Sequence, residues 1–146
     1  YLTYNEISGL GFEQARVIQV TIDDPATKEL NNLEKGFGVS TDVFFRKNDF
    51  SLTSEGTQML DLLLGVLSKY PALKLEIACH TDNVGSASSN QFLSQKRAEA
   101  MVNYLANNGV NRLRLTAKGY GGSRPVAPNY QESDRKNNRR IDFTVL

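Results

Sequence analysis

The sequence predicts an α/β sandwich whose elements follow the order β-α-β-α-β, with helices packed on a small sheet. Two patterns predict this fold class: short segments in which apolar and polar residues alternate, and two longer segments in which apolar residues recur at helical spacing. The chain has 146 residues, 40% of them hydrophobic and 23% charged, which suffices for one ordinary domain with a core. Long disorder is therefore not expected.

The alternation begins with a strand and a helix. The short apolar segment 43–45 predicts the strand. The helix is expected to begin at about Leu52 with Thr53 as its N-cap, and its apolar residues between 59 and 67 recur at helical spacing. Pro71 should end this helix, because proline lacks the backbone N–H that would continue it.

The remaining elements repeat the same order. Period-two alternation predicts the strands, and apolar residues three and four positions apart predict the helix. In chain order they are a strand with one buried face over 73–79, a turn over 81–85, a helix from about Asn90 to Asn107 that stops at Gly109, a strand over 113–117, a glycine-rich loop over 119–125 and a last strand over 141–145.

Residues 1–35 lack this regular order. The β-branched segment 17–22 is typical of a strand, and Asp23-Asp24-Pro25 is typical of a turn. We therefore expect a short β-rich accessory strand, hairpin or linker segment at 1–35 and the main domain at 36–146. Because the chain begins at Tyr1 rather than Met, we also expect it to be a fragment of a longer, processed protein.

Composition and charge exclude several classes of protein. The longest apolar runs are as short as Leu62-Leu63-Leu64, so no segment can span a bilayer. One cysteine, Cys79, excludes an intrachain disulfide, and with the single His80 it leaves too few ligands for a zinc site, so we expect no metal and no cofactor. The net charge of +1 does not suggest non-specific nucleic-acid binding. Residues 112–146 hold eight basic and three acidic residues, which form a solvated surface, an anion site or a docking face.

Polar residues after the second strand predict a binding site. Right-handed crossovers bring the loops that follow the strands to one edge of the sheet, so the 81–90 loop and the start of the second helix should converge there. Asn90, Leu93 and Arg97 line one stripe of this helix, apart from its core stripe, and Asp82 lies in the preceding loop. Asp82 and Arg97 form either a surface salt bridge or a clamp for a zwitterion, in which Arg97 binds a carboxylate and Asp82 an ammonium group.

The sequence offers no catalytic constellation. Cys79 and His80 are adjacent on a strand, so their side chains point to opposite faces and cannot act as a nucleophile and its base. Cys79 shares the parity of the buried positions and is expected to be an inert thiol, whereas His80 should orient the turn that follows. The glycines at 119–122 lack the pattern of a phosphate-binding loop. We therefore expect a protein that is not an enzyme.

Several ordered motifs of the chain are similar to one protein family. The motifs are HTDNVG (80–85), NQFLSQKRA (90–98), GV (109–110), RL (114–115), GYG (119–121), Pro125, Asn129 and NRRI (138–141). Together they resemble the OmpA C-terminal (OmpA-like) peptidoglycan-binding domain over about residues 36–146. The resemblance implies a mixed four-stranded sheet with helices, and a domain that binds the stem peptide of peptidoglycan through its diaminopimelate residue.

The same resemblance implies which residues bind this ligand. Asp82 of the first motif and Arg97 of the second would hold the diaminopimelate group, which is a zwitterion of the kind inferred above. The other ligand-binding residues that it implies are Asn90, Arg140, Asn48, Thr81, Val84 and Leu93.

Two further points concern the residues around this site. Arg140 has the opposite parity to the buried positions of the last strand, so its side chain should leave the core face and reach the ligand edge, while the direction of Arg139 stays open. The chain departs from the family pattern at three positions, where it has Asp134 for a glycine, Phe50 for a small residue and Cys79 for a glycine.

We expect a periplasmic module that tethers the outer membrane to the cell wall through an upstream membrane anchor, with a homodimer left open. Three alternatives stay open. In the first, the domain anchors a motor stator or a secretion machine to peptidoglycan. In the second, it hydrolyses cell-wall peptides. In the third, it binds nucleic acid through the basic 112–140 segment. A steep salt dependence of binding would indicate nucleic acid. A single inner-membrane helix upstream of this domain would indicate the anchor of a motor stator or secretion machine.

Overall fold

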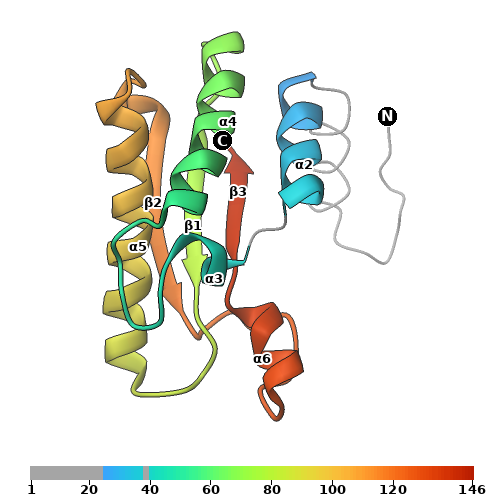
Figure 1. The fold of residues 1–146 in the computed structure, drawn as a ribbon, viewed down its shortest axis with the longest axis vertical. Coiled ribbons are helices and arrows are strands. Elements are labelled where there is room, and N and C mark those ends of the chain that lie inside the picture. Colours follow the sequence, from blue (N-terminus) through green and yellow to red (C-terminus); the bar gives the residue numbers. More distant parts are fainter. Residues whose placement is uncertain (1–24, 38–39) are drawn as a thin grey trace.

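A sheet of three strands and the helices packed on it form the part of the chain that the structure describes. The computed structural model describes residues 25–37 and 40–146. Its elements in chain order, drawn in Figure 1, are α2 (Pro25–Phe37), α3 (Thr41–Phe44), α4 (Ser54–Lys69), β1 (Leu75–His80), α5 (Ala87–Asn107), the 3-10 helix η1 (Arg112–Arg114), β2 (Leu115–Gly121), α6 (Glu132–Asn138) and β3 (Ile141–Val145).

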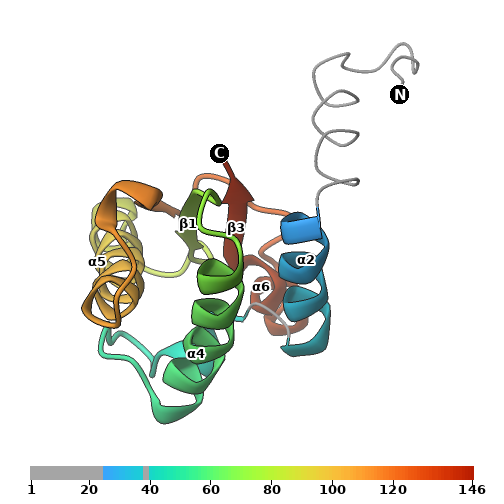
Figure 2. The ribbon, with the colours of Figure 1, turned by 90° about the horizontal axis from the view of Figure 1, so that it is seen from above.

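The mixed sheet has the strand order β2-β1-β3. The central strand β1 pairs in parallel with β2, with Leu75 opposite Leu115, and antiparallel with β3, with Ile77 opposite Phe143. Helices α4 and α5 lie on one side of the sheet and α2 packs against α4 (Figures 1 and 2). The carboxyl ends of β1 and β2 therefore meet at one edge, where α6 also lies.

Side chains cap the start of both long helices, and the cap of the first was predicted from the sequence. Thr53 is the N-cap of α4, and its side chain accepts a hydrogen bond of 3.0 Å from the backbone N–H of Gly56. Helix α5 begins three residues before its expected start, because the Ser86 side chain caps it by accepting from the N–H of Ser89 at 3.1 Å. Gly109 follows α5 with a φ of +105°, a left-handed conformation that favours glycine.

The core fills the space between the sheet and the two long helices. The central strand is buried on both faces rather than on one, because Ala78 and His80 are buried as fully as Ile77 and Cys79 on the other face. The fully buried apolar side chains include Leu60 and Leu67 of α4, Leu75 and Ile77 of β1, Met101 and Leu105 of α5, and Ile141 of β3.

The predicted strand over 43–45 is wrong. Phe44 ends the short helix α3, and Phe45 makes only an isolated bridge to Leu52. The Ser40 side chain caps this helix, and the N–H of Phe45 donates to the Thr41 carbonyl across one helical turn. A helical turn lets the adjacent rings of Phe44 and Phe45 both be buried, which alternation along a one-sided strand does not. The described sheet thus has three strands instead of the expected four.

The expected β-rich N-terminal extension is not supported. Residues 25–37 form helix α2, which opens with Pro25, a favourable first residue for a helix. Ala26 and Leu30 of α2 are buried in the same core as α4 and β1. The predicted strand over 17–22 lies outside the described residues.

The bounds of β2 also differ from those expected. Leu113 lies in η1 and is 86% exposed, so the strand begins two residues later. The guanidinium of the neighbouring Arg114 donates hydrogen bonds to three backbone carbonyls. These belong to Leu67, Tyr70 and Leu73, at 2.8 to 3.0 Å. At its other end β2 continues to Gly121 into the expected loop, and helix α6 was not predicted at all.

Candidate ligand-binding site

The turn after β1 presents Asp82 at the sheet edge. The backbone N–H of Thr81 donates to the Gly121 carbonyl at 2.9 Å, and the Asp82 carboxylate accepts from the N–H of Val84 at 3.0 Å. The side-chain amide of Asn90 donates to the Val84 carbonyl at 3.0 Å. Asn90, Thr81 and Val84 thus support the turn in the arrangement that the structure shows, and they leave the Asp82 side chain 13% exposed.

Arg139 joins three carboxylates at this edge. Its guanidinium lies 2.9 Å from Asp82, 3.2 Å from Asp42 and 2.5 Å from Glu132, and so links the β1–α5 turn to α3 and α6. The hydrogen bonds that Arg139 donates to Glu132 first, and then to Asp42 and Asp82, raise its pKa. Arg139 in turn lowers the pKa of Glu132. The sequence left the direction of Arg139 open, and the structure makes it the cationic partner of Asp82.

Arg97 lies under the loop that joins α3 to α4. Its Nε donates to the Asp49 carbonyl at 2.8 Å and its Nη2 to the Arg46 carbonyl at 3.1 Å, while the guanidinium stands 5.0 Å from the centre of the Phe45 ring. Burial lowers the pKa of Arg97. Within residues 40–146, no hydrogen bond engages its Nη1. This nitrogen is therefore available to an incoming carboxylate.

The position of Arg97 on α5 differs from that expected from its stripe. Arg97 is only 6% exposed and shares the buried side of the helix with Ser94 and Ala98. Its charge is compensated by carbonyl dipoles rather than by Asp82, whose ion pair is with Arg139. In the described residues, the simple Asp82–Arg97 salt bridge that the sequence left open is not formed.

The remaining site candidates lie in three different surroundings. Asn48 is exposed at the tip of the loop over Arg97 and has a φ of +59°, which asparagine adopts more readily than most residues. Leu93 is half-buried on α5. Arg140 points away from the core face, as its parity predicted, but its Nε pairs with Asp142 at 3.2 Å rather than with Asp82 or Arg97. Arg139 thus occupies the place beside Asp82 that was expected for Arg140.

Cys79 is buried, as the sequence predicted, whereas His80 contacts Tyr120 and Asp142 rather than the turn that it was expected to orient. Cys79 is fully buried, and burial raises the pKa of its thiol to about 12, so it is protonated at neutral pH. On the opposite face, the His80 ring stacks on Tyr120 at 5.2 Å, and its Nε2 lies 3.0 Å from Asp142. Across the described ranges, no cluster of side chains is suited to a metal ion, and no helix combines the length and apolarity needed to cross a bilayer.

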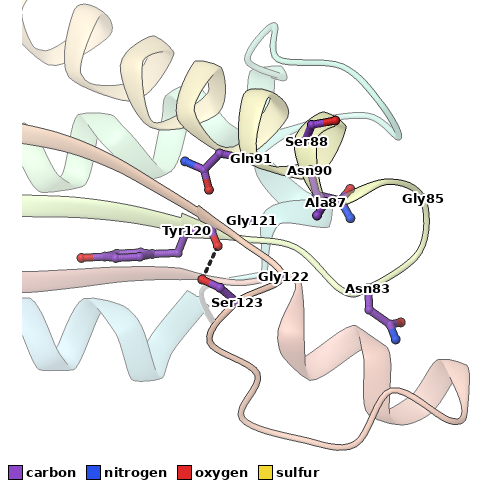
Figure 3. Close-up of a pocket in the computed structure, with 10 residues that line it drawn as sticks. All are labelled: Asn83, Gly85, Ala87, Ser88, Asn90, Gln91, Tyr120, Gly121, Gly122 and Ser123. Carbon is purple, nitrogen blue, oxygen red and sulfur yellow. Dashed lines mark hydrogen bonds between the residues drawn. The ribbon is translucent and has the colours of Figure 1, made fainter.

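A pocket of about 540 Å³ borders the same turn. Figure 3 shows it between the start of α5, the turn residues Asn83 and Gly85, and the end of β2 at Tyr120. Its polar side chains are amides, hydroxyls and one phenol, and its lining includes no acidic or basic residue. This neutral pocket is chemically unlike the charged groups of Asp82 and Arg97.

The fold and these contacts together define a small α/β domain with charged side chains at the edge where β1 and β2 end. Residues 44–139 match the OmpA family. The chain belongs to this family, and the resemblance predicted from its motifs is confirmed.

Two relatives are similar over much of the chain. Outer membrane porin F of Pseudomonas fluorescens is 46% identical over 83 residues, which are 57% of this chain and 26% of the porin. The peptidoglycan-associated lipoprotein of Buchnera aphidicola is 32% identical over 118 residues, which are 81% of this chain and 66% of the lipoprotein. The chain thus spans about a quarter of the porin and two thirds of the lipoprotein. These names are not those of enzymes, in agreement with the prediction that this protein is not one.

Two solved structures share the fold. The peptidoglycan-associated lipoprotein of Burkholderia pseudomallei has a TM-score of 0.65 and 30% identity, and the match covers 71% of this chain and 88% of that one. A putative MotB like protein from Desulfovibrio vulgaris has a TM-score of 0.75 over 91% of this chain and 94% of its own. At 23% identity the second likeness shows the fold alone.

Proposed function

We propose that this domain binds peptidoglycan without covalent attachment and so anchors the protein that carries it to the cell wall. Its membership of the OmpA family and its likeness to two peptidoglycan-associated lipoproteins support this proposal. The charged edge at the ends of β1 and β2 is a suitable place for the ligand, since binding sites in α/β folds form beyond the carboxyl ends of the strands.

The recognised group is the zwitterionic side-chain end of diaminopimelate in the stem peptide. Arg97 carries this assignment, because its guanidinium is anchored by two carbonyls and keeps Nη1 without a partner among residues 40–146. A carboxylate placed there receives a charge-assisted hydrogen bond from a group that loses little freedom on binding. Asp82 accepts the ammonium group, and Arg139 holds its carboxylate in place from the other side.

The full-length protein would then sit in the periplasm and link the outer membrane to the wall, with its membrane anchor outside the present chain. The relatives named as an outer membrane porin and a lipoprotein support this arrangement. An anchor for a motor stator or a secretion machine would use the same edge in the same way. A single inner-membrane helix upstream would favour that alternative.

A pull-down on purified, insoluble peptidoglycan sacculi tests the proposal. Arg97→Ala and Asp82→Asn should each weaken binding at least tenfold, because each leaves one charge of the bound zwitterion without its partner. Sacculi with lysine in place of diaminopimelate should also be bound more weakly, because lysine lacks the second carboxylate. The control is Arg112→Ala, which removes an exposed arginine at the opposite end of β2.

Melting temperatures separate binding from folding, since Arg97 also holds the loop at 46–49. If Asp82→Asn and Arg97→Ala are folded and retain full binding, the site is elsewhere. If sacculi with lysine and sacculi with diaminopimelate are bound equally, the domain binds peptidoglycan but does not recognise diaminopimelate.

A further inference from the structure

Two phenylalanine rings stand together on the surface of the domain. Phe50 belongs to the loop between α3 and α4 and is 44% exposed, and Phe92 belongs to the second turn of α5 and is 58% exposed. Their ring centres are 6.4 Å apart and the ring planes meet at 84°. Single exposed apolar side chains are common, whereas two exposed rings in contact form a small apolar corner.

The corner is continuous with the proposed ligand site. Phe50 directly follows Asp49, whose carbonyl accepts from Arg97, and Phe92 directly precedes Leu93 on the stripe that leads to Arg97. Figure 1 shows the loop that carries Phe50 reaching across to α5. The loop that anchors Arg97 therefore also carries one ring of the corner, and the helix that carries Arg97 also carries the other.

The surroundings of the corner are basic. Lys96 stands 5.6 Å from the centre of the Phe92 ring and pairs with Glu99 at 3.7 Å, and Arg46 and Lys47 are exposed on the loop that precedes Phe50. The carboxylate of Asp49 faces back into this loop and accepts from the N–H of Ser51 at 3.0 Å. The corner thus combines apolar ring surface with positive charge, which fits a ligand with both apolar faces and carboxylates.

We propose that the Phe50–Phe92 corner stacks against a sugar ring of the glycan strand to which the stem peptide is attached. This inference rests on the proposed function, and it adds the saccharide to the groups that the domain recognises. A pyranose ring has an apolar face of C–H bonds that packs on an aromatic ring, and the second, perpendicular ring flanks it. The basic side chains around the corner face the carboxylates of the attached peptide.

A second copy of this chain is a poorer occupant. An aromatic side chain buries about 150 to 250 Å², and both rings are already about half covered. The corner therefore offers on the order of 200 Å², well below the roughly 800 Å² per partner of a stable protein interface. One sugar ring matches the size of the corner.

The test compares two soluble ligands by isothermal titration calorimetry. One is the disaccharide-tetrapeptide of peptidoglycan with diaminopimelate, and the other is the same tetrapeptide without its sugars. The wild-type chain should bind the sugar-bearing ligand about three- to tenfold more tightly, the range expected for one aromatic stacking contact. Phe50→Ala and Phe92→Ala should each remove most of this preference and leave the affinity for the sugar-free peptide unchanged.

Two controls accompany these variants. Phe92→Tyr keeps a flat ring and should retain the preference, and Leu113→Ala removes an exposed apolar side chain at the far end of β2 and should change nothing. Equal affinity of the wild type for both ligands overturns the stacking proposal and leaves the proposed function intact, whereas binding of neither ligand overturns the proposed function. The stacking proposal is also overturned if the Phe variants keep the sugar preference, lose both ligands equally, or abolish a dimer seen by sedimentation.

Discussion

Arg97 and Arg139 differ in what their guanidinium groups bind, and this difference assigns their roles. Arg97 is compensated by the carbonyls of Arg46 and Asp49 and has no carboxylate partner among the described residues. Arg139 is saturated by three carboxylates, including that of Asp82. Arg97 is therefore suited to contact a ligand anion, whereas Arg139 is suited to position Asp82.

Replacing Arg139 should affect both folding and binding. Arg139→Ala removes hydrogen bonds to charged groups and leaves three carboxylates close together, so we expect a loss of about 1–3 kcal/mol in the free energy of unfolding and weaker binding to sacculi. Arg139→Lys should be intermediate, because an ammonium group cannot bridge the three acids in the same way. Urea unfolding and sacculus binding measure the two effects. The exposed Lys136→Ala is the charge-matched control. Unchanged stability in Arg139→Ala would contradict the bridging role.

Among the elements, α5 and β2 make the closest approach. Gly119 of β2 lies directly against the backbone of α5, and a Cβ added to it would be 2.2 Å from the nitrogen of Gln95. The Gln95 side chain also accepts from the N–H of Gly119 at 2.8 Å. This contact holds the carboxyl end of β2 and the start of α5 together, and so places both beside the turn that carries Asp82.

Alanine at two glycines should therefore have opposite effects. Gly119→Ala forces backbone against backbone and should cost about 3 kcal/mol or more of stability. Gly65→Ala, in the exposed part of α4 with no atom within 4 Å of the added methyl group, should gain about 0.5–1 kcal/mol. Thermal and urea unfolding of the two variants measure the difference. Similar stability of the two variants would contradict the close packing of β2 on α5.

For the whole molecule, carboxylates decide how stability depends on pH. Burial would raise the pKa of Asp142, but hydrogen bonding to His80 and the charge of Arg140 outweigh it, so the pKa of Asp142 is lowered in the folded state. Backbone hydrogen bonds from Ser51 likewise lower the pKa of Asp49. A carboxyl whose folded pKa lies below its unfolded pKa stabilises the fold above the unfolded value. That contribution is lost as the pH falls through the folded value.

The domain should therefore lose stability below about pH 4, near the unfolded pKa of aspartate. Asp142→Asn should be less stable than the wild type at pH 7, by less than about 1 kcal/mol because the side chain is half exposed. The difference should shrink as the pH falls below the unfolded pKa of aspartate toward the lowered folded pKa of Asp142, because the wild-type carboxyl becomes protonated there. Urea unfolding at pH 7, 5 and 3 measures it. A difference that stays constant over this range would show that Asp142 acts through packing rather than charge.

Much of the architecture follows from local sequence. Thr53 marks the start of α4, apolar periodicity marks both long helices, and alternation marks β1 and β3. These signals are reliable because caps and amphipathic patterns depend on neighbouring residues only. The strand predicted over 43–45 was wrong because a run of three apolar residues fits a strand and a buried helical turn equally well.

The order of motifs and elements along the chain predicts the family and the βαβ core, because right-handed crossovers follow from chain order. It also predicts Asp82 in the turn after β1 and Arg97 on α5. The tertiary structure is needed to see that Arg139 rather than Arg140 pairs with Asp82. Arg139 is the C-cap of α6, with backbone angles of neither helix nor strand, so strand parity does not set its direction. The partners of Arg97 and the contact of Phe50 with Phe92 are likewise set by how a distant loop packs on α5, which no local pattern encodes.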